Sequence, residues 1–215
     1  MLFRGGLIFL ADSFALAAVM LGASICGGNN AFAMLRPRLT LAVKFIEFAP
    51  HSESDGPALT RGQADKVIET INQEYAQCGL SLVLGDYEKI DPATIGLPYR
   101  LDSMSELESV RQAFNDPRYL VVIDTGPWNH ARMGSANAWT AMPGDQPSGA
   151  VLEGPVASDA PVLAHELGHY LGLEHISDLT DMMNPVIYSN STLILSDQCQ
   201  QMLHTAQADR SLALR

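Results

Sequence analysis

Basic residues are scarce in this chain of 215 residues, which has 13 Lys and Arg against 24 Asp and Glu and a formal net charge of -11. Nucleic acids and anionic membrane surfaces attract proteins through clustered positive charge. The composition therefore argues against a nucleic-acid partner and against docking on an anionic membrane. Apolar residues make up 47% of the chain, which excludes an intrinsically disordered protein and suits one folded domain of ordinary size.

Long apolar runs are also lacking, apart from one near the N-terminus. That run, Ser13–Cys26, has ~14 residues and is short for a membrane span of ~20 residues. Arg4 precedes it and Ala31–Ala33 follows it as a small-x-small cleavage pattern. We therefore predict a signal peptide over residues 1–33 and a mature chain that begins at Met34. An uncleaved membrane anchor is the alternative.

This prediction sets the compartment of the mature protein. A cleaved signal peptide implies a secreted or periplasmic protein with no stable membrane association afterwards. Removal of the signal peptide also removes Cys26, one of only three cysteines in the chain. The remaining two, Cys78 and Cys199, can pair in an oxidising compartment and would then close a loop of more than 100 residues. Two free buried thiols are the other possibility.

The segment from His165 to His175 carries the strongest functional pattern in the chain. On a helix, His165 and His169 lie one turn apart on the same face, so both rings can reach one metal ion. A continuing helix would place His175 roughly 240° around the axis from His169, pointing away from that ion. Gly172 can end the helix because glycine enters the left-handed region without Cβ strain. His175 can then return as a third ligand.

Three histidines leave a fourth position open on a tetrahedral zinc ion. Structural zinc sites are closed by four protein ligands, usually with cysteine, and no cysteine lies near this segment. An open, catalytic site with Zn²⁺ as the cofactor is therefore favoured, and Glu166 stands beside the first ligand. Asp178 or Asp181 remains an alternative third ligand. The scattered acidic residues form no dense calcium-loop pattern, so a calcium site is left open without support.

The pattern His165, Glu166, His169, Gly172 and His175 resembles the long zinc-binding motif of the metzincin metallopeptidases. Downstream, Asp181–Pro185 resembles the Met-turn of that clan, with Met183 as the methionine below the zinc site. The resemblance implies that Glu166 is the catalytic general base and that the three histidines bind the metal. No subfamily is assigned. Pro185 stands where some metzincins carry a tyrosine ligand, and the residue after His175 matches none of the better-known groups.

Apolar periodicity and turn residues predict the order of helices and strands. A helix capped by Thr60 should run until Gly79, and the zinc helix should begin near Pro161. The other predicted elements are strands at Leu39–Phe48, Leu80–Leu84, Tyr119–Asp124, Ala136–Met142 and Gly149–Leu152, and helices at Ser105–Phe114 and Ser196–Ala208. Between Thr125 and Pro155 the Gly, Pro, Asn and Ser content otherwise predicts ordered loops.

By the same resemblance, the fold class is α+β, a metzincin-like catalytic domain. It implies a twisted mixed sheet with two long helices in an upper subdomain, about 34–172. A small, mostly irregular lower subdomain, about 173–215, would end in a helix. No internal repeat or linker suggests a second domain within 34–215, and we expect a monomer.

The expected function is a secreted zinc-dependent endopeptidase whose partner is a protein or peptide substrate. An extended substrate would pair with a strand edge near Ala138 and Trp139, although an ordinary covered strand is the alternative there. Ile187 and Tyr188, after the Met-turn, are expected to line the pocket just beyond the scissile bond, although Tyr188 also suits a core position. Two further functions remain open: a non-enzymatic zinc-stabilised binding module, and an amidase acting on cell-wall peptides. His130 and His204 are expected to be surface or core histidines.

Overall fold

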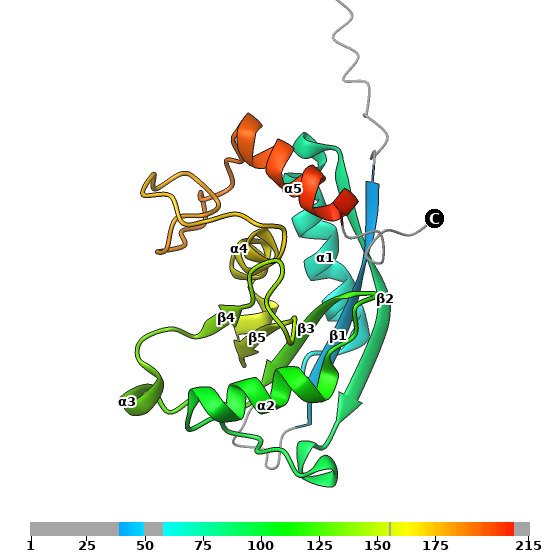
Figure 1. Cartoon of the computed structure of the whole chain (residues 1–215), viewed down its shortest axis with the longest axis vertical. Coiled ribbons are helices and arrows are strands. Elements are labelled where there is room, and N and C mark those ends of the chain that lie inside the picture. The colour runs from blue at the N-terminus through cyan, green and yellow to red at the C-terminus, as the bar shows by residue number, and fades with distance from the viewer. Residues whose placement is uncertain (1–38, 50–57, 155, 209–215) are drawn as a thin grey trace, which may run out of the picture. The chain divides into compact units, whose positions relative to one another are not determined.

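The structure is a computed structural model that describes residues 39–49, 58–154 and 156–208. The predicted signal peptide and the predicted start at Met34 lie outside the described residues. In the described part of the chain, no helix is both long enough and apolar enough to cross a membrane. In chain order (Figure 1), the elements are β1 (Leu39–Phe48), α1 (Arg61–Tyr75), β2 (Leu80–Ile90), α2 (Met104–Phe114), β3 (Leu120–Thr125), α3 (His130–Met133), β4 (Ala138–Thr140), β5 (Ala150–Glu153), α4 (Ala160–Tyr170) and α5 (Ser196–Ala208).

The five strands form one mixed sheet in the order β2-β1-β3-β5-β4. β1 pairs in parallel with β2 and β3, and β3 pairs in parallel with β5, whereas β4 runs antiparallel to β5. β4 is therefore an edge strand, and the rest of its sheet is parallel. The fold is α+β with a mixed sheet, as the sequence predicted.

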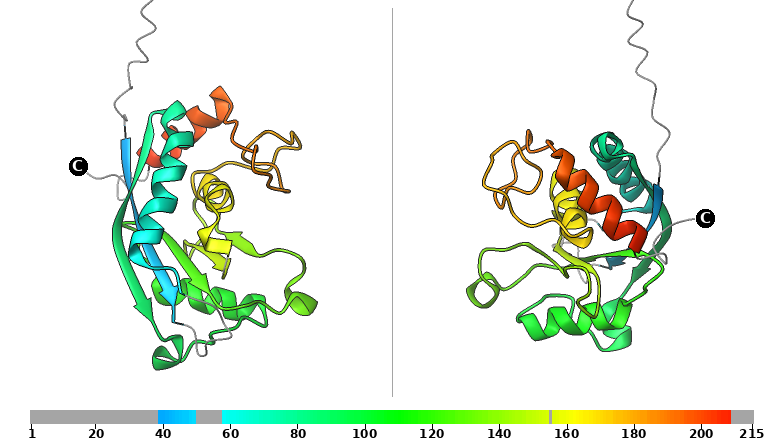
Figure 2. Two further views of the ribbon diagram at one scale, coloured as in Figure 1. Left: turned by 180° about the vertical axis from the view of Figure 1, so that it is seen from behind. Right: turned by 45° about the horizontal axis from the view of Figure 1, so that its top comes forward.

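Helices cover both faces of the sheet (Figures 1 and 2). β3 shows why, because Leu120 and Val122 belong to the apolar core that includes α1 and α4, while Val121 and Ile123 belong to the core beneath α2. A strand that is buried on both faces has a continuous apolar sequence, as β3 has from Leu120 to Ile123. The hydroxyl of Tyr75 on α1 donates to the carbonyl of Ala164 on α4, so the two helices are also joined directly.

The sequence predicted the start of the first helix correctly. Thr60 caps α1, and its side chain and that of Gln63 exchange hydrogen bonds with the backbone as a capping box. The regular α-helix ends at Tyr75, one 3-10 turn follows, and Gly79 then adopts the left-handed region with φ 71°. A glycine is favoured there because other residues pay a Cβ penalty.

The prediction that the second strand ends at Leu84 was too short, because β2 continues to Ile90. Gly85 sits where the pairing with β1 shifts register between Val43 and Lys44, so it forms an irregularity within the strand. A Cβ at Gly85 would lie 2.8 Å from Cε1 of Tyr119, which explains a glycine in the middle of the strand. The region after Thr125 also holds the short helix α3, where only loops and strands were predicted.

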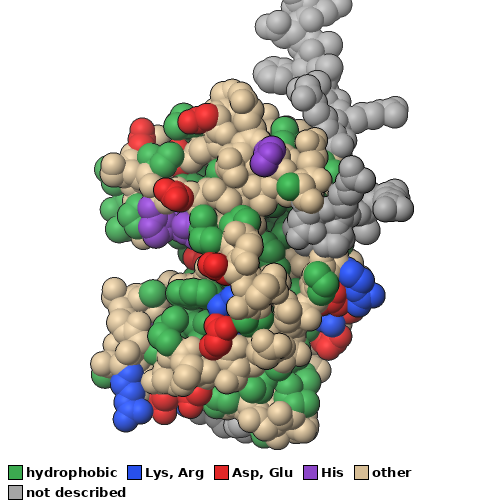
Figure 3. All heavy atoms as spheres, in the orientation of Figure 1, with side chains coloured by type: hydrophobic (Ala, Val, Ile, Leu, Met, Phe, Trp, Pro, Cys, Tyr) green, Lys and Arg blue, Asp and Glu red, His purple; other side chains and the backbone are tan. Residues whose placement is uncertain are grey.

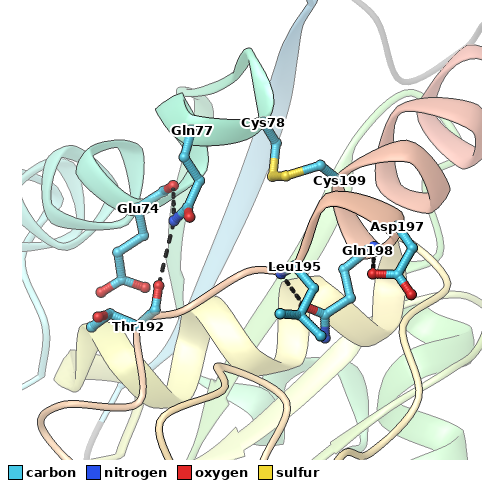
Figure 4. The surroundings of a disulfide bond; sticks show 8 residues. All are labelled: Glu74, Gln77, Cys78, Thr192, Leu195, Asp197, Gln198 and Cys199. Atoms are coloured by element: carbon cyan, nitrogen blue, oxygen red, sulfur yellow. Dashed lines mark hydrogen bonds between the residues drawn. A yellow bond between two sulfur atoms is a disulfide. The ribbon is translucent and has the colours of Figure 1, made fainter.

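A disulfide joins Cys78, just before β2, to Cys199 on α5 (Figure 4). The two Cα atoms are 4.8 Å apart and the cysteines are separated by 121 residues in the sequence. Cross-linking a loop of this length stabilises the folded chain by up to ~4–5 kcal/mol in the chain-entropy model. Near it, Gln77 donates to the carbonyl of Thr192, so the segment before α5 is also held against the end of α1. The bridge thus ties the last helix to the first.

Candidate metal centre

Three histidines converge at one end of α4 and in the loop after it. Nε2 of His175 lies 3.2 Å from Nε2 of His165 and 3.1 Å from Nε2 of His169. Ligands at ~2.0–2.1 Å from a tetrahedral zinc ion are separated by roughly 3.3 Å, so the spacing suits one such ion. Within the described residues, this is the one group of three or more His, Cys, Asp or Glu side chains with the spacing of a metal site.

The other ring nitrogens of the two helical histidines are held by backbone carbonyls. Nδ1 of His165 lies 2.8 Å from the carbonyl oxygen of Met182, and Nδ1 of His169 lies 2.7 Å from that of Leu173. A carbonyl only accepts, so each Nδ1 carries the proton and each Nε2 keeps its lone pair for a metal. Burial lowers the pKa of His169 and lowers that of His165 to about 4. Both rings are therefore neutral near pH 7, the form that binds zinc.

The chain reverses after α4 in the way that the third ligand requires. α4 ends at Tyr170, and Gly172 has φ 89°. The amide of Leu173 donates to the carbonyl of Gly168, which closes the turn. A Cβ at Gly172 would also lie 2.9 Å from the side chains of Gln201 and Thr205, so α5 crowds this turn. A glycine is therefore favoured here by both the positive φ and the close packing. The turn brings His175 back to the other two histidines.

Met183 lies below the helix that carries the histidines and is fully buried. A Cβ at Gly168 would be only 2.5 Å from Sδ of Met183 and 3.0 Å from Cε of Met182, so the helix approaches this turn at a glycine. The amide of Ile176 donates to the carbonyl of Met183, which connects the turn to the residue after His175. The predicted Met-turn thus packs against the helix that carries two of the three histidines.

The two aspartates that remained as alternative ligands have other partners. Oδ1 of Asp181 accepts from the amide of Met183 and from the side chain of Gln198. Oδ1 of Asp178 accepts from the amide and the hydroxyl of Thr180. Neither aspartate belongs to the group of converging ligand atoms. Both therefore act here as anchors for the loop that carries Met183.

Glu166 is buried beside the first histidine, with 6% of its surface exposed. Burial raises the pKa of its carboxyl to about 7, and a hydrogen bond from Thr140 opposes that rise. The hydroxyl of Thr140, the last residue of β4, donates to Oε2 of Glu166 at 2.5 Å. A carboxyl with a pKa near the working pH suits a group that takes up and releases a proton. Thr140 was missed from the sequence, where nothing marks a contact across 26 residues.

The predicted substrate strand, β4, has no partner strand on its outer edge among the described residues. Ala138 packs against the core that contains α4, while Trp139 points to the opposite face and packs against the core beneath α2. The guanidinium carbon of Arg111 lies 4.4 Å from the centroid of the Trp139 ring. Arg111 itself is buried and pairs with Glu108 at 2.8 Å, so the edge strand rests on a fixed cationic side chain.

The segment after the Met-turn is exposed rather than part of the core. Val186 is 56% exposed and Tyr188 is 46% exposed, while Ile187 between them is partly buried. The alternative placement of Tyr188 in the core is therefore wrong. His130, which is also exposed, lies 3.0 Å from Glu153 through its Nε2 atom and does not join the metal cluster. His204 is exposed on α5 and does not join it either.

A comparison with known families gives a match that contains the whole site. The family model described as matrixin matches residues 109–203, a range that includes the edge strand, the three histidines and the Met-turn. A comparison with curated proteins gives no match.

Solved structures resemble the fold at low sequence identity. Mature mirolysin from Tannerella forsythia, in complex with a cleaved peptide, is 12% identical, with a TM-score of 0.59 over 80% of this chain and 94% of that one. Archaemetzincin from Methanopyrus kandleri is 14% identical, with a TM-score of 0.50 over 78% of this chain and 96% of that one. Metalloproteinase-II from Bacteroides fragilis is 15% identical, with a TM-score of 0.49 over 80% of this chain, which spans only 54% of that protein. The first two similarities concern the fold.

Proposed function

We propose that this chain, a zinc metallopeptidase of the metzincin clan with no subfamily assigned, is an extracytoplasmic endopeptidase that hydrolyses peptide bonds in protein or peptide substrates. One observation carries the proposal: a buried carboxylate, Glu166, stands on the same helix as two of three converging imidazoles. A site that only stabilises the fold has no use for this carboxylate. Its position instead suits proton transfer next to a metal.

The residues present fit a zinc ion in their number, spacing and protonation. His165, His169 and His175 would hold it, and the bound ion would supply a Lewis acid that acidifies water and polarises a carbonyl group. Glu166 takes a proton from the attacking water and delivers it to the leaving amine nitrogen. Thr140 holds one carboxylate oxygen of Glu166 throughout and so orients the other.

Substrate binding follows from the edge strand. An extended peptide can add a strand to the free edge of β4, so that main-chain hydrogen bonds hold it across the histidine cluster. The exposed apolar side chains of Val186 and Tyr188 lie after the Met-turn and are available to contact the residue that follows the scissile bond. The solved mirolysin structure contains a cleaved peptide, and a peptide substrate is proposed here for a chain with a similar fold.

Export through the predicted signal peptide places this activity outside the cytoplasm. The disulfide between Cys78 and Cys199 supports this placement, because such bonds persist in oxidising compartments. We expect the mature chain to act as a monomer.

Two substitutions test the proposal on zinc-loaded protein with a broad peptide library. Glu166→Gln removes the proton carrier but no metal ligand, so zinc content and folding should persist while hydrolysis falls by ~10²–10⁴-fold. His175→Ala removes a ligand, so zinc affinity, thermal stability and hydrolysis should all fall. His130→Ala is the matched control, because this exposed histidine lies outside the cluster and should leave zinc content unchanged.

Two outcomes would contradict the proposal. Equal activity of Glu166→Gln and the parent would exclude the role of Glu166. A parent that is fully loaded with zinc and cleaves no peptide would favour a zinc-stabilised binding module instead.

A further inference from the structure

A pocket of about 530 Å³ opens beyond the C-terminal end of β4, and we call it the β4-end pocket. One wall is the loop that leaves β4, the other is the last turns of α5, and Tyr119 and Tyr170 complete the lining. Its size falls in the ~300–1,000 Å³ range of pockets that hold small ligands. The residues that line it are Pro117, Tyr119, Ala141, Met142, Pro143, Gly144, Asp145, Gln146, Ser148, Tyr170, Gln201, His204, Thr205 and Ala208.

The loop side of the pocket is held in place by hydrogen bonds. The amide and the hydroxyl of Ser148 both donate to Oδ1 of Asn115, at 3.2 Å and 2.9 Å. The side chain of Asn115 also donates to that of Gln146, and the amide of Asp145 donates to the carbonyl of Met142. A loop held in this way forms a wall before any ligand arrives, which lowers the ordering cost of binding.

The opposite side of the pocket shares parts with the candidate catalytic site. Tyr170 is the last residue of α4, the helix that carries two of the histidines. Its hydroxyl donates to the carbonyl of Tyr119 at 3.3 Å. Ala141, the first loop residue in the lining, directly follows Thr140, which holds Glu166. The pocket therefore continues the substrate strand rather than forming a separate site on a distant surface.

The pocket lies on the far side of the histidine cluster from the segment after the Met-turn. Figures 1 and 2 show the chain between α4 and α5 on one side of α4 and the C-terminal end of α5 on the other. Figure 3 shows a groove that crosses this face of the molecule from the purple histidine cluster. A peptide whose residue after the scissile bond contacts Val186 and Tyr188 would therefore direct its preceding residues towards the β4-end pocket.

The chemistry of the lining favours an apolar occupant. Tyr119, Met142, Pro143 and Tyr170 present rings and a thioether. Asp145 is the one acidic residue in the lining. Large apolar and aromatic side chains gain most from burial against such a surface.

We propose that the β4-end pocket is a specificity site that receives a large apolar or aromatic side chain of the peptide substrate, from a residue N-terminal to the scissile bond. The proposal rests on the peptidase function above and names the part of the substrate that is selected. Burial of a ring or a branched aliphatic chain there should strengthen binding by ~10-fold or more relative to glycine.

The test measures binding separately from catalysis. The probes are short peptides with a C-terminal hydroxamate, a group that binds zinc. Their residues therefore occupy the positions that lie N-terminal to the scissile bond in a substrate. Calorimetry on the zinc-loaded full chain gives the affinity of each peptide. The series carries either phenylalanine or glycine at each position in turn. We expect one position at which phenylalanine binds ~10-fold tighter than glycine.

Filling the pocket should remove that preference. Thr205→Trp places a ring in the lining, and Ala208→Trp does so at the end of α5. If one of the two variants does not fold, the other still tests the proposal. Gln207→Trp is the matched control, since this exposed residue of α5 is not in the lining and its variant should keep the preference.

The outcomes distinguish the two proposals. A series with no preferred position, no measurable binding, or a preference that both filled variants retain would overturn the pocket proposal. The same peptides extended across the scissile bond report cleavage. A parent that keeps the preference in binding but cleaves none of them supports the pocket and refutes the endopeptidase function. Cleavage without any preference on the N-terminal side supports the endopeptidase function and refutes the pocket proposal.

Discussion

Oε2 of Glu166 on the zinc helix accepts a hydrogen bond of 2.5 Å from the hydroxyl of Thr140, the last residue of the edge strand. The two residues come from elements that are separated by a long loop and β5, and their contact joins the predicted substrate strand to the predicted proton carrier. A carboxylate that is held through one oxygen cannot rotate freely, so its second oxygen keeps a fixed direction. Thr140 is therefore a positioning residue for Glu166.

Thr140→Val removes this donor while it keeps the branched shape of the side chain. We expect kcat to fall by ~10-fold or more, the range for loss of one hydrogen bond to a charged group, with KM and zinc content little changed. Thr140→Ser retains a hydroxyl and should recover most of the activity. Steady-state kinetics with metal analysis measure both effects. A valine variant with the kcat of the parent would remove Thr140 from the mechanism.

Gly168→Ala tests the close approach of α4 to the Met-turn. The added Cβ would lie 2.5 Å from Sδ of Met183, so the Met-turn must shift, and overpacking of this kind costs ~1–3 kcal/mol. The matched control is Gly62→Ala on α1, where a Cβ meets nothing within 4 Å and helix propensity favours alanine by up to ~1 kcal/mol. Thermal unfolding should show a lower Tm for the first variant and an equal or higher Tm for the second. The same Tm change in both would contradict the packing argument.

Two buried carboxyls make stability depend on pH. Glu47 on β1 and Asp124 on β3 are neighbours across the sheet and are almost fully buried. Burial raises the pKa of both groups, and the neighbouring carboxyl of Glu47 raises the pKa of Asp124 further, whereas the hydrogen bond with Asp124 opposes the rise at Glu47. Groups whose pKa is raised in the folded state favour folding while they are protonated. Their contribution to stability is full below the unfolded pKa values of ~4, and it is lost as pH rises from there through the raised folded values.

Urea unfolding at a series of pH values above 5 should therefore show falling stability in the parent. Asp124→Asn removes one ionisable group and should flatten that fall, whereas Glu69→Gln, an exposed change on α1, should not. An equally steep pH dependence in the parent and in Asp124→Asn would exclude the pair as its source.

The predicted disulfide and the predicted start of the mature chain can be tested together on the exported protein. Intact mass under non-reducing conditions should correspond to a chain that starts near Met34 and lacks two hydrogens, because Cys78 and Cys199 are joined. Reduction should lower the free energy of unfolding by up to ~4–5 kcal/mol. Two thiols that react with an alkylating agent in the native protein would exclude the bridge, and the metal centre would be unaffected.

Features that depend on neighbouring residues were predictable from the sequence. The helical spacing of His165 and His169, the turn at Gly172 and the capping box of Thr60 all follow from backbone geometry within a few residues. The bounds of the last helix, Ser196–Ala208, were also predicted as they stand in the structure, because its apolar positions recur at helical spacing.

Only the tertiary structure decided the features that bring distant segments together. The sequence predicted a strand that ends at Leu84, but β2 continues past Gly85, because the ring of Tyr119 packs where a side chain at Gly85 would be. The contacts of Thr140 with Glu166 and of Arg111 with Trp139, and the β4-end pocket, depend on how the edge strand is set against α4, α5 and α2. Sequence patterns report the local preferences of the backbone, whereas distances between remote side chains are set by the packing of the whole core.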